Sequence, residues 1–122
     1  MNTVVLGQSN ITTTRLALGL AALGRPGYIN IGHGSDMGGF YNIRQMETHT
    51  HAMLDKAWDL GIRHFDAARS YGKAEAFLGS WLRRRLLKGE KPVISSKWGY
   101  TYTANWQVKA DKHEVKEHSR QV

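Results

Sequence analysis

The chain has 122 residues, of which 41% are hydrophobic and 22% charged, a composition typical of one modest globular domain. It contains no cysteine, which excludes disulfide bonds, thiolate catalysis and cysteine-ligated zinc. No apolar run approaches the roughly 20 residues of a membrane-spanning helix, and the residues after Met1 lack the basic flank of a secretory signal. We therefore expect a soluble cytoplasmic protein with no membrane partner.

The charge balance is basic, with 17 Lys and Arg against 10 Asp and Glu, a net charge of +7. Part of this charge lies near the carboxyl end of a predicted helix, where cations favour the helix dipole (Arg83, Arg84, Arg85 and Lys88). More of it follows Lys109. No nucleic-acid-binding motif accompanies the charge, so we expect no nucleic-acid partner. A basic nucleic-acid-binding module remains an alternative, which salt-dependent DNA binding would support.

The amino-terminal third predicts short extended elements. Residues 4–15 fit a small hairpin around the turn at residues 7–10. Residues 16–20 are a brief apolar run with the length of a buried strand. Residues 21–42 are rich in glycine and aromatic side chains without sustained periodicity, which predicts a long loop.

Two helices and two further strands follow. Helical spacing begins near Glu47 and ends at Gly61, with apolar positions at Met53, Leu54, Ala57, Trp58 and Leu60. Residues 62–66 predict a strand. The second helix carries an apolar stripe and ends at Gly89 (Phe77, Leu78, Trp81, Leu82 and Leu86). Residues 92–97 predict the third strand, because proline is tolerated where a strand starts.

Alternation of strands and helices implies an α/β architecture with parallel strands and right-handed crossovers. We see one unit over residues 1–122, without an internal repeat. Residues 111–117 resemble the opening turns of a third helix, so residues 109–122 predict a frayed or incomplete helix.

Three polar side chains are candidates for chemistry. Asp66 closes the second predicted strand and Lys97 the third, and Tyr71 follows Asp66 by five residues. Side chains at the carboxyl ends of parallel strands face the ligand site, and neighbouring strands lie about 4.8 Å apart. The three groups are therefore expected to converge.

Their combined chemistry suits carbonyl reduction. A lysine at the end of an apolar strand needs a counter-charge, which Asp66 supplies. A cation beside the Tyr71 hydroxyl favours the phenolate, so this tyrosine can exchange a proton near neutral pH. The alternative is structural: Asp66 and Lys97 form only an ion pair, and Tyr71-Gly72 is only a turn.

The sequence resembles the aldo-keto reductase family from about Leu6 to Trp98. Residues 61–75 (GIRHFDAARSYGKAE) have the family's glycine, a strand ending in aspartate-x-alanine, then tyrosine-glycine and a nearby glutamate. Residues 77–79 (FLG), 94–97 (ISSK) and 18–21 (LGLA) continue the likeness. Residues 113–119 resemble the sugar-oxidising branch.

This resemblance implies a (β/α)8 TIM barrel, here in part: an amino-terminal hairpin, the first three strands and two helices. It implies hydride transfer between NADP or NAD, with NADP favoured, and a small carbonyl, alcohol or sugar substrate. By the same likeness Tyr71 is the proton donor, Lys97 tunes it, and Asp66 holds Lys97 beside the nicotinamide.

The resemblance also implies where ligands lie. Gly19, Leu20 and Ala21 match the segment whose backbone passes the cofactor, although Leu20 replaces a common threonine. The expected lining of the substrate pocket comprises Tyr28, Phe40, Tyr41 and Trp98.

Two further patterns are weaker evidence for a functional site. The glycine-rich residues 32–39 match neither the dinucleotide nor the Walker spacing, which favours a loop over a phosphate cradle. His49 and His51 do not face each other on a helix and have no third ligand, so we expect no metal and two histidines in solvent.

The full barrel needs roughly 250 residues and eight strand–helix units, and the family's catalytic histidine has no counterpart here. His113 and His118 lie in the polar segment predicted to start a helix. A non-catalytic fragment that needs a complementing chain is therefore a second alternative.

We predict that the 122-residue chain, expressed alone, is inactive and aggregation-prone or only partly folded, since its parallel strands have open edges. Thermal unfolding and NADPH titration of the purified chain test this. A cooperative transition together with micromolar cofactor affinity would show the prediction to be wrong.

Overall fold

The structure of the protein, a computed structural model, describes residues 1–26, 42–104, 106 and 114–118. Its described helices are α2 (Ile43–Asp59) and α3 (Ala74–Leu87). Neither is long and apolar enough to cross a bilayer. The strands are β1 (Thr3–Val5), β2 (Thr12–Thr14), β3 (Ala17–Gly19), β4 (His64–Asp66), β5 (Val93–Ser95), β6 (Tyr100–Tyr102) and β7 (Glu114–Lys116).

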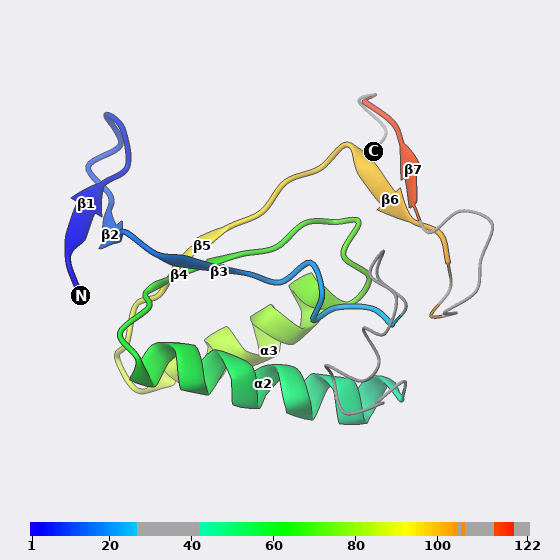
Figure 1. The fold of residues 1–122 in the computed structure, drawn as a ribbon, viewed down its shortest axis with the longest axis horizontal. Coiled ribbons are helices and arrows are strands. Elements are labelled where there is room, and N and C mark those ends of the chain that lie inside the picture. The colour runs from blue at the N-terminus through cyan, green and yellow to red at the C-terminus, as the bar shows by residue number, and fades with distance from the viewer. Residues whose placement is uncertain (27–41, 105, 107–113, 119–122) are drawn as a thin grey trace.

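The centre of the structure is a parallel sheet in the order β3-β4-β5 (Figure 1). Residues Leu18, Phe65 and Ile94 lie side by side across it. The antiparallel hairpin β1-β2 lies beyond one end of this sheet and the antiparallel pair β6-β7 beyond the other (Figure 1). The predicted α/β architecture, a partial barrel with an amino-terminal hairpin, three parallel strands and two helices, is confirmed.

Both helices cover the same face of the sheet (Figure 1). Phe65 points to that side and is fully buried, with its ring centroid 4.9 Å from that of Trp81 on α3. The core gathers around this contact (Leu20, Leu23, Met46, Leu54, Ala57, Ala67, Ala74, Phe77 and Leu78). Because successive strand residues point to opposite faces, the neighbours of Phe65 lie on the other face.

Helix α2 begins earlier than predicted, at Ile43. Asn42 caps it, because its side-chain oxygen accepts hydrogen bonds from the backbone N–H groups of Arg44 (2.9 Å) and Gln45 (3.2 Å). A single asparagine at the end of a segment rich in glycine and aromatic side chains is a weak signal in the sequence alone.

The buried face of α2 also differs from the predicted one. Met53 and Leu60 are 42% and 63% exposed, whereas Met46 and Thr50 are fully buried. Thr50 belongs to the core because its hydroxyl donates a 2.8 Å hydrogen bond to the Leu23 carbonyl oxygen. The prediction that Met53 and Leu60 lie on the buried face was wrong. It counted apolar side chains only, and so it could not place the buried Thr50 on that face.

The predicted helix over residues 111–117 is contradicted where the structure describes it. Glu114–Lys116 form β7, in which Tyr102 pairs with Glu114 and Tyr100 with Lys116. The Glu117 amide then donates to the Gly99 carbonyl oxygen at 2.6 Å. The segment had no apolar stripe to hold a helix, and β6 supplies its backbone groups with partners instead. Residues 111–113 and 119–122 lie outside the described residues.

Removing the Trp81 ring should loosen the packing of α3 against the sheet. Trp81 is 1% exposed and its indole N–H donates to Asp55 at 2.8 Å, so Trp81→Ala should destabilise by about 3–5 kcal/mol. Hydrogen–deuterium exchange of the α3 amides measures this opening locally. Leu87→Ala, at a position 84% exposed on the same helix, is the control and should change stability by less than about 0.5 kcal/mol. Equal exchange in both variants would contradict the assigned core.

Candidate active site

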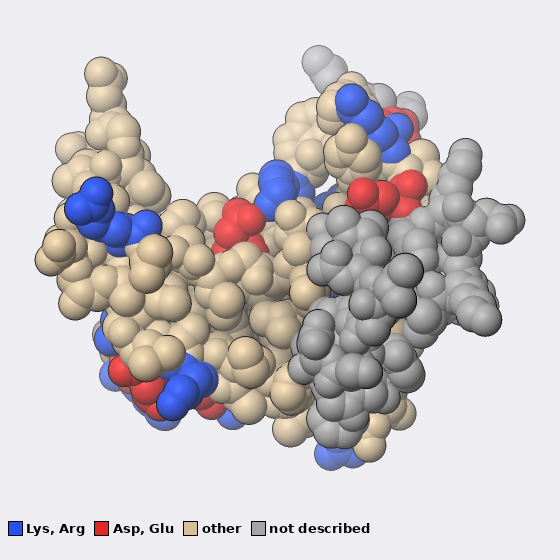
Figure 2. Space-filling view, viewed as in Figure 1, with Lys and Arg blue, Asp and Glu red and all other residues tan. Residues whose placement is uncertain are grey.

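The sheet register brings the candidate residues to one rim. Asp66 ends β4 and lies opposite Gly19 on β3 and Ser95 on β5. Lys97 follows β5 by two residues, so its side chain starts from the same rim. Figure 2 shows that this side of the molecule is hollowed between the hairpin and the β6-β7 pair, with acidic and basic side chains in the hollow.

The structure brings Asp66, Lys97 and Tyr71 together. The Lys97 ammonium nitrogen lies 2.6 Å from Oδ2 of Asp66 and 3.0 Å from the Ala67 carbonyl oxygen. It also lies 4.7 Å from the centroid of the Tyr71 ring. The cation therefore sits between a carboxylate and an aromatic ring.

The electrostatics of this cluster favour an ion pair. Partial burial disfavours the charged form of Asp66, but hydrogen bonds from Lys97 and Ser95 and the Lys97 charge outweigh it and lower the pKa of Asp66. Burial likewise disfavours charge on Lys97, but hydrogen bonding to Asp66 and Tyr71 outweighs it and raises the pKa of Lys97. Both groups are thus charged at neutral pH. Because their side chains are 34% and 51% exposed, solvent screens the attraction and its contribution to stability is small.

A close backbone contact fixes the position of Tyr71. The Lys73 amide donates to the Gly24 carbonyl oxygen at 2.6 Å, and the Ala74 amide donates to that of Tyr71 at 3.0 Å. Gly72 adopts φ +60°, and a Cβ at Gly24 would lie 2.0 Å from the Tyr71 carbonyl oxygen. Only glycine at residue 24 lets the two segments approach this closely.

A pocket of about 290 Å³ opens beside two of the three candidate residues. Tyr71 and Lys97 line it together with Trp98, which is 62% exposed. Tyr100 and Glu114 complete its outer wall, and the sequence prediction missed both, because only the β6-β7 pairing brings them there. The one signal in the sequence for this wall was Tyr100 itself, an aromatic residue two positions after Trp98.

The predicted cofactor segment lies along the same rim. Gly19 is exposed, and no atom lies within 4 Å of where its Cβ would be. The Leu20 amide donates to the Asp66 carbonyl oxygen at 2.8 Å, while the Leu20 side chain is fully buried in the core. Ala21 is half-buried. A ligand at this rim would therefore meet the backbone of Leu20 and not its side chain.

Three of the residues predicted to line the substrate pocket, Tyr28, Phe40 and Tyr41, lie outside the described residues, as does the glycine-rich segment 32–39. Trp98 is the member of that set whose place the structure describes.

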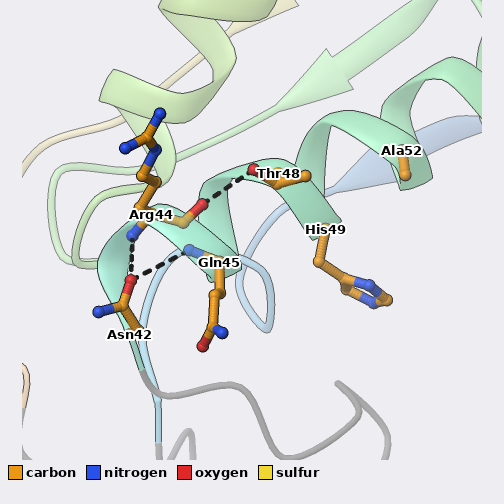
Figure 3. Close-up of a pocket in the computed structure, with 6 residues that line it drawn as sticks. All are labelled: Asn42, Arg44, Gln45, Thr48, His49 and Ala52. Atoms are coloured by element: carbon orange, nitrogen blue, oxygen red, sulfur yellow. Dashed lines mark hydrogen bonds between the residues drawn. The ribbon is translucent and has the colours of Figure 1, made fainter.

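A larger pocket, of about 540 Å³, lies along the first turns of α2 (Figure 3). The hydrogen bonds described for its lining run within the helix: the first amides donate to the Asn42 side-chain oxygen, and the Thr48 hydroxyl donates to the Arg44 carbonyl oxygen at 3.0 Å. It contains none of the three candidate residues, and its polar side chains are exposed or partly exposed. Size alone does not make it the active site.

The expectation of two solvent histidines on α2 is wrong for His51. Its Nε2 lies 2.8 Å from the Ser80 hydroxyl and 3.0 Å from the Phe77 carbonyl oxygen, both on α3. Its Nδ1 lies 2.7 Å from the Arg84 guanidinium. His51 therefore joins the two helices, which spacing on one helix does not reveal.

The arginine cluster is partly engaged inside the molecule. Arg85 forms ion pairs with Asp55 and, at 2.9 Å, with Glu90. Arg84 contacts His51. The nucleic-acid alternative depends on basic residues that include Arg84 and Arg85, and both of these contact side chains within this chain.

Comparison with known proteins agrees with the predicted family and fold. The model of the aldo/keto reductase family matches residues 16–121. Pyridoxal 4-dehydrogenase of Microbacterium luteolum is 37% identical over 100 residues, which cover 80% of this chain and 24% of that protein. A crystal structure described as an aldo-keto reductase from Pseudomonas aeruginosa superposes with a TM-score of 0.63 and 25% identity, over 94% of this chain and 35% of that one.

The chain belongs to the aldo/keto reductase family, an oxidoreductase family, because the family model matches most of its length. It spans about a quarter of the length of the matched dehydrogenase and about a third of that of the matched crystal structure.

A methyl group at residue 24 should displace Tyr71. Gly24→Ala would place Cβ 2.5 Å from the Ala74 side chain as well, so we expect overpacking that costs about 1–3 kcal/mol. Gly79→Ala is the matched control, since its Cβ meets nothing within 4 Å and alanine in a helix stabilises by about 0.5–1 kcal/mol. Hydrogen–deuterium exchange of the Tyr71 and Ala74 amides should accelerate only for Gly24→Ala. Unchanged exchange in that variant would refute the contact.

Proposed function

We propose that this chain carries the proton-transfer part of an NAD(P)-dependent oxidoreductase that moves hydride between a nicotinamide and a small carbonyl or alcohol. The observation that supports this most directly is the Lys97 ammonium, 2.6 Å from Asp66 and 4.7 Å from the centre of the Tyr71 ring. The family gives the reaction class. Tyr71, Lys97 and Asp66 are the residues to which we assign the chemistry.

The roles follow from charge. When a carbonyl is reduced, negative charge develops on its oxygen, and a hydroxyl held at that oxygen can supply the proton. We assign this donor to Tyr71. Lys97, charged at neutral pH, stabilises the phenolate left behind, and Asp66 keeps the ammonium at the rim. In the oxidative direction Tyr71 accepts the proton from the alcohol.

The rim fits a nicotinamide ring. Gly19 leaves open space opposite Asp66, and the backbones of Leu20 and Ala21 continue along the edge. We propose that these residues and Asp66 border the ring, which supplies or accepts the hydride when bound. Trp98 and Tyr100 would then form the substrate wall, beside the undescribed Tyr28, Phe40 and Tyr41. Both NADP and NAD are candidates, with NADP the first to test.

The first substrate to test is pyridoxal, because a relative named pyridoxal 4-dehydrogenase is 37% identical over 100 residues. The pocket supports a planar aromatic ring: Trp98 and Tyr100 line it, and its volume of about 290 Å³ is close to the lower limit of ligand pockets. Sugars form the alternative substrate class.

The experiment is complementation. The 122-residue chain is mixed with the part of the Microbacterium luteolum protein that the match does not cover, and turnover of pyridoxal and of simple aldehydes is followed with each nucleotide. We expect activity in the mixture. Tyr71→Phe should lower kcat by about 100-fold or more, since general acid catalysis typically contributes 100- to 10,000-fold.

Tyr100→Phe is the matched control, because it removes a hydroxyl from the same pocket but keeps the aromatic ring that we assign to the substrate wall, and no described interaction joins Tyr100 to Lys97. It should retain most of the activity. No turnover in a mixture whose two parts associate would support the non-catalytic alternative. Equal losses in the two tyrosine variants would remove the special role of Tyr71.

A further inference from the structure

A second polar group lies on the open face of the sheet, directly behind the ion pair. The Ser95 hydroxyl donates to Oδ1 of Asp66 at 2.7 Å, and Nε2 of His64 lies 2.9 Å from the same hydroxyl. All three side chains are half-buried. The contacts form a continuous row: His64, Ser95, Asp66 and then Lys97.

The row follows from the register. His64 and Asp66 are two residues apart on β4 and so point to the same face, away from Phe65 and the helices. Ser95 is the direct cross-strand partner of Asp66 on β5. The cross-strand partner of His64 is Val93, so Ser95 is its diagonal neighbour. A hydroxyl at residue 95 can therefore reach both.

The direction of these hydrogen bonds is determined by proton count. A serine hydroxyl has one proton, and an ionised carboxylate only accepts. Since Ser95 donates its proton to Asp66, it must accept one from His64. A neutral His64 then carries its proton on Nε2, and its Nδ1 is the acceptor nitrogen.

The two oxygens of Asp66 consequently have separate partners. Oδ1 accepts from Ser95 within β5, and Oδ2 accepts from Lys97 beyond the end of β5. Two donors, one in β5 and one just after it, fix the plane of the carboxylate as well as its position. Without Ser95, Lys97 would be the one described side-chain donor left to Asp66, and the carboxylate could rotate about its Cα–Cβ and Cβ–Cγ bonds.

We propose that Ser95 is a positioning residue that orients the Asp66 carboxylate toward Lys97, and that His64 fixes Ser95 as the donor by supplying an Nε2 proton. The effect of this positioning on catalysis rests on the proposed function, whereas the hydrogen bonds that link His64, Ser95, Asp66 and Lys97 do not. The adjacent Ser96 has no part in it, because its hydroxyl donates to Glu75 at 2.5 Å.

The test uses NMR on the isotope-labelled 122-residue chain associated with the unlabelled complementing portion, without cofactor. At pH 8, where an unperturbed imidazole is neutral, the ¹⁵N shifts of His64 should show the Nε2–H form. The charged and titratable side chains facing Asp66 are Lys97 and His64. Ser95→Ala should raise the pKa of Asp66, followed through its carboxyl ¹³C shift, because the carboxylate loses a donor.

Two variants separate positioning from general loss of structure. Ser95→Thr keeps the hydroxyl and should restore the wild-type titration of Asp66. Ser96→Ala, one residue away on the chain, should leave it unchanged.

If wild-type His64 shows the Nδ1–H form or an average of both forms, the proposal is wrong, and this result does not require Ser95→Ala to fold. The proposal is also wrong if the pKa of Asp66 is the same in Ser95→Ala and wild type, or if Ser96→Ala raises that pKa equally. Since no nucleotide or substrate is present, these outcomes are independent of whether the complemented enzyme turns over.

Discussion

The pairing of β4 with β5 is the constraint on which the core and the rim both depend. In the observed register Phe65 lies beside Ile94, and Asp66 lies beside Ser95. A shift of β4 by one residue would turn every side chain of β4 to the opposite face. Phe65 would leave Trp81, and Asp66 would enter an apolar core without a counter-charge. Burial of Phe65 therefore holds Asp66 on the face where Lys97 can reach it.

Much of this arrangement could be predicted because it depends on local signals. The ends of strands are visible in the sequence, and parallel pairing brings Asp66 and Lys97 to one rim, with Tyr71 on the segment that follows β4. The family likeness rested on these residues, and the match over residues 16–121 confirms the family. The assigned roles of the residues remain proposals.

What could not be predicted depends on contacts between distant segments. Gly24 and Gly72 are 48 residues apart in the sequence, yet their backbones are in close contact next to Tyr71. Thr50 is buried because of a carbonyl oxygen 27 residues away, and the segment around Val115 becomes a strand because of β6. Periodicity describes one segment at a time, so it cannot identify a partner that the fold supplies.

Placing both helices on one face of the sheet gives neighbouring strand residues separate tasks (Figure 1). Phe65 packs beneath the sheet, and the adjacent Asp66 carries charge above it. Polar substitutions along the upper layer can therefore alter reactivity while the hydrophobic layer keeps the scaffold intact. Such a division of labour lets natural variation, or a protein engineer, explore new chemistry on a constant framework.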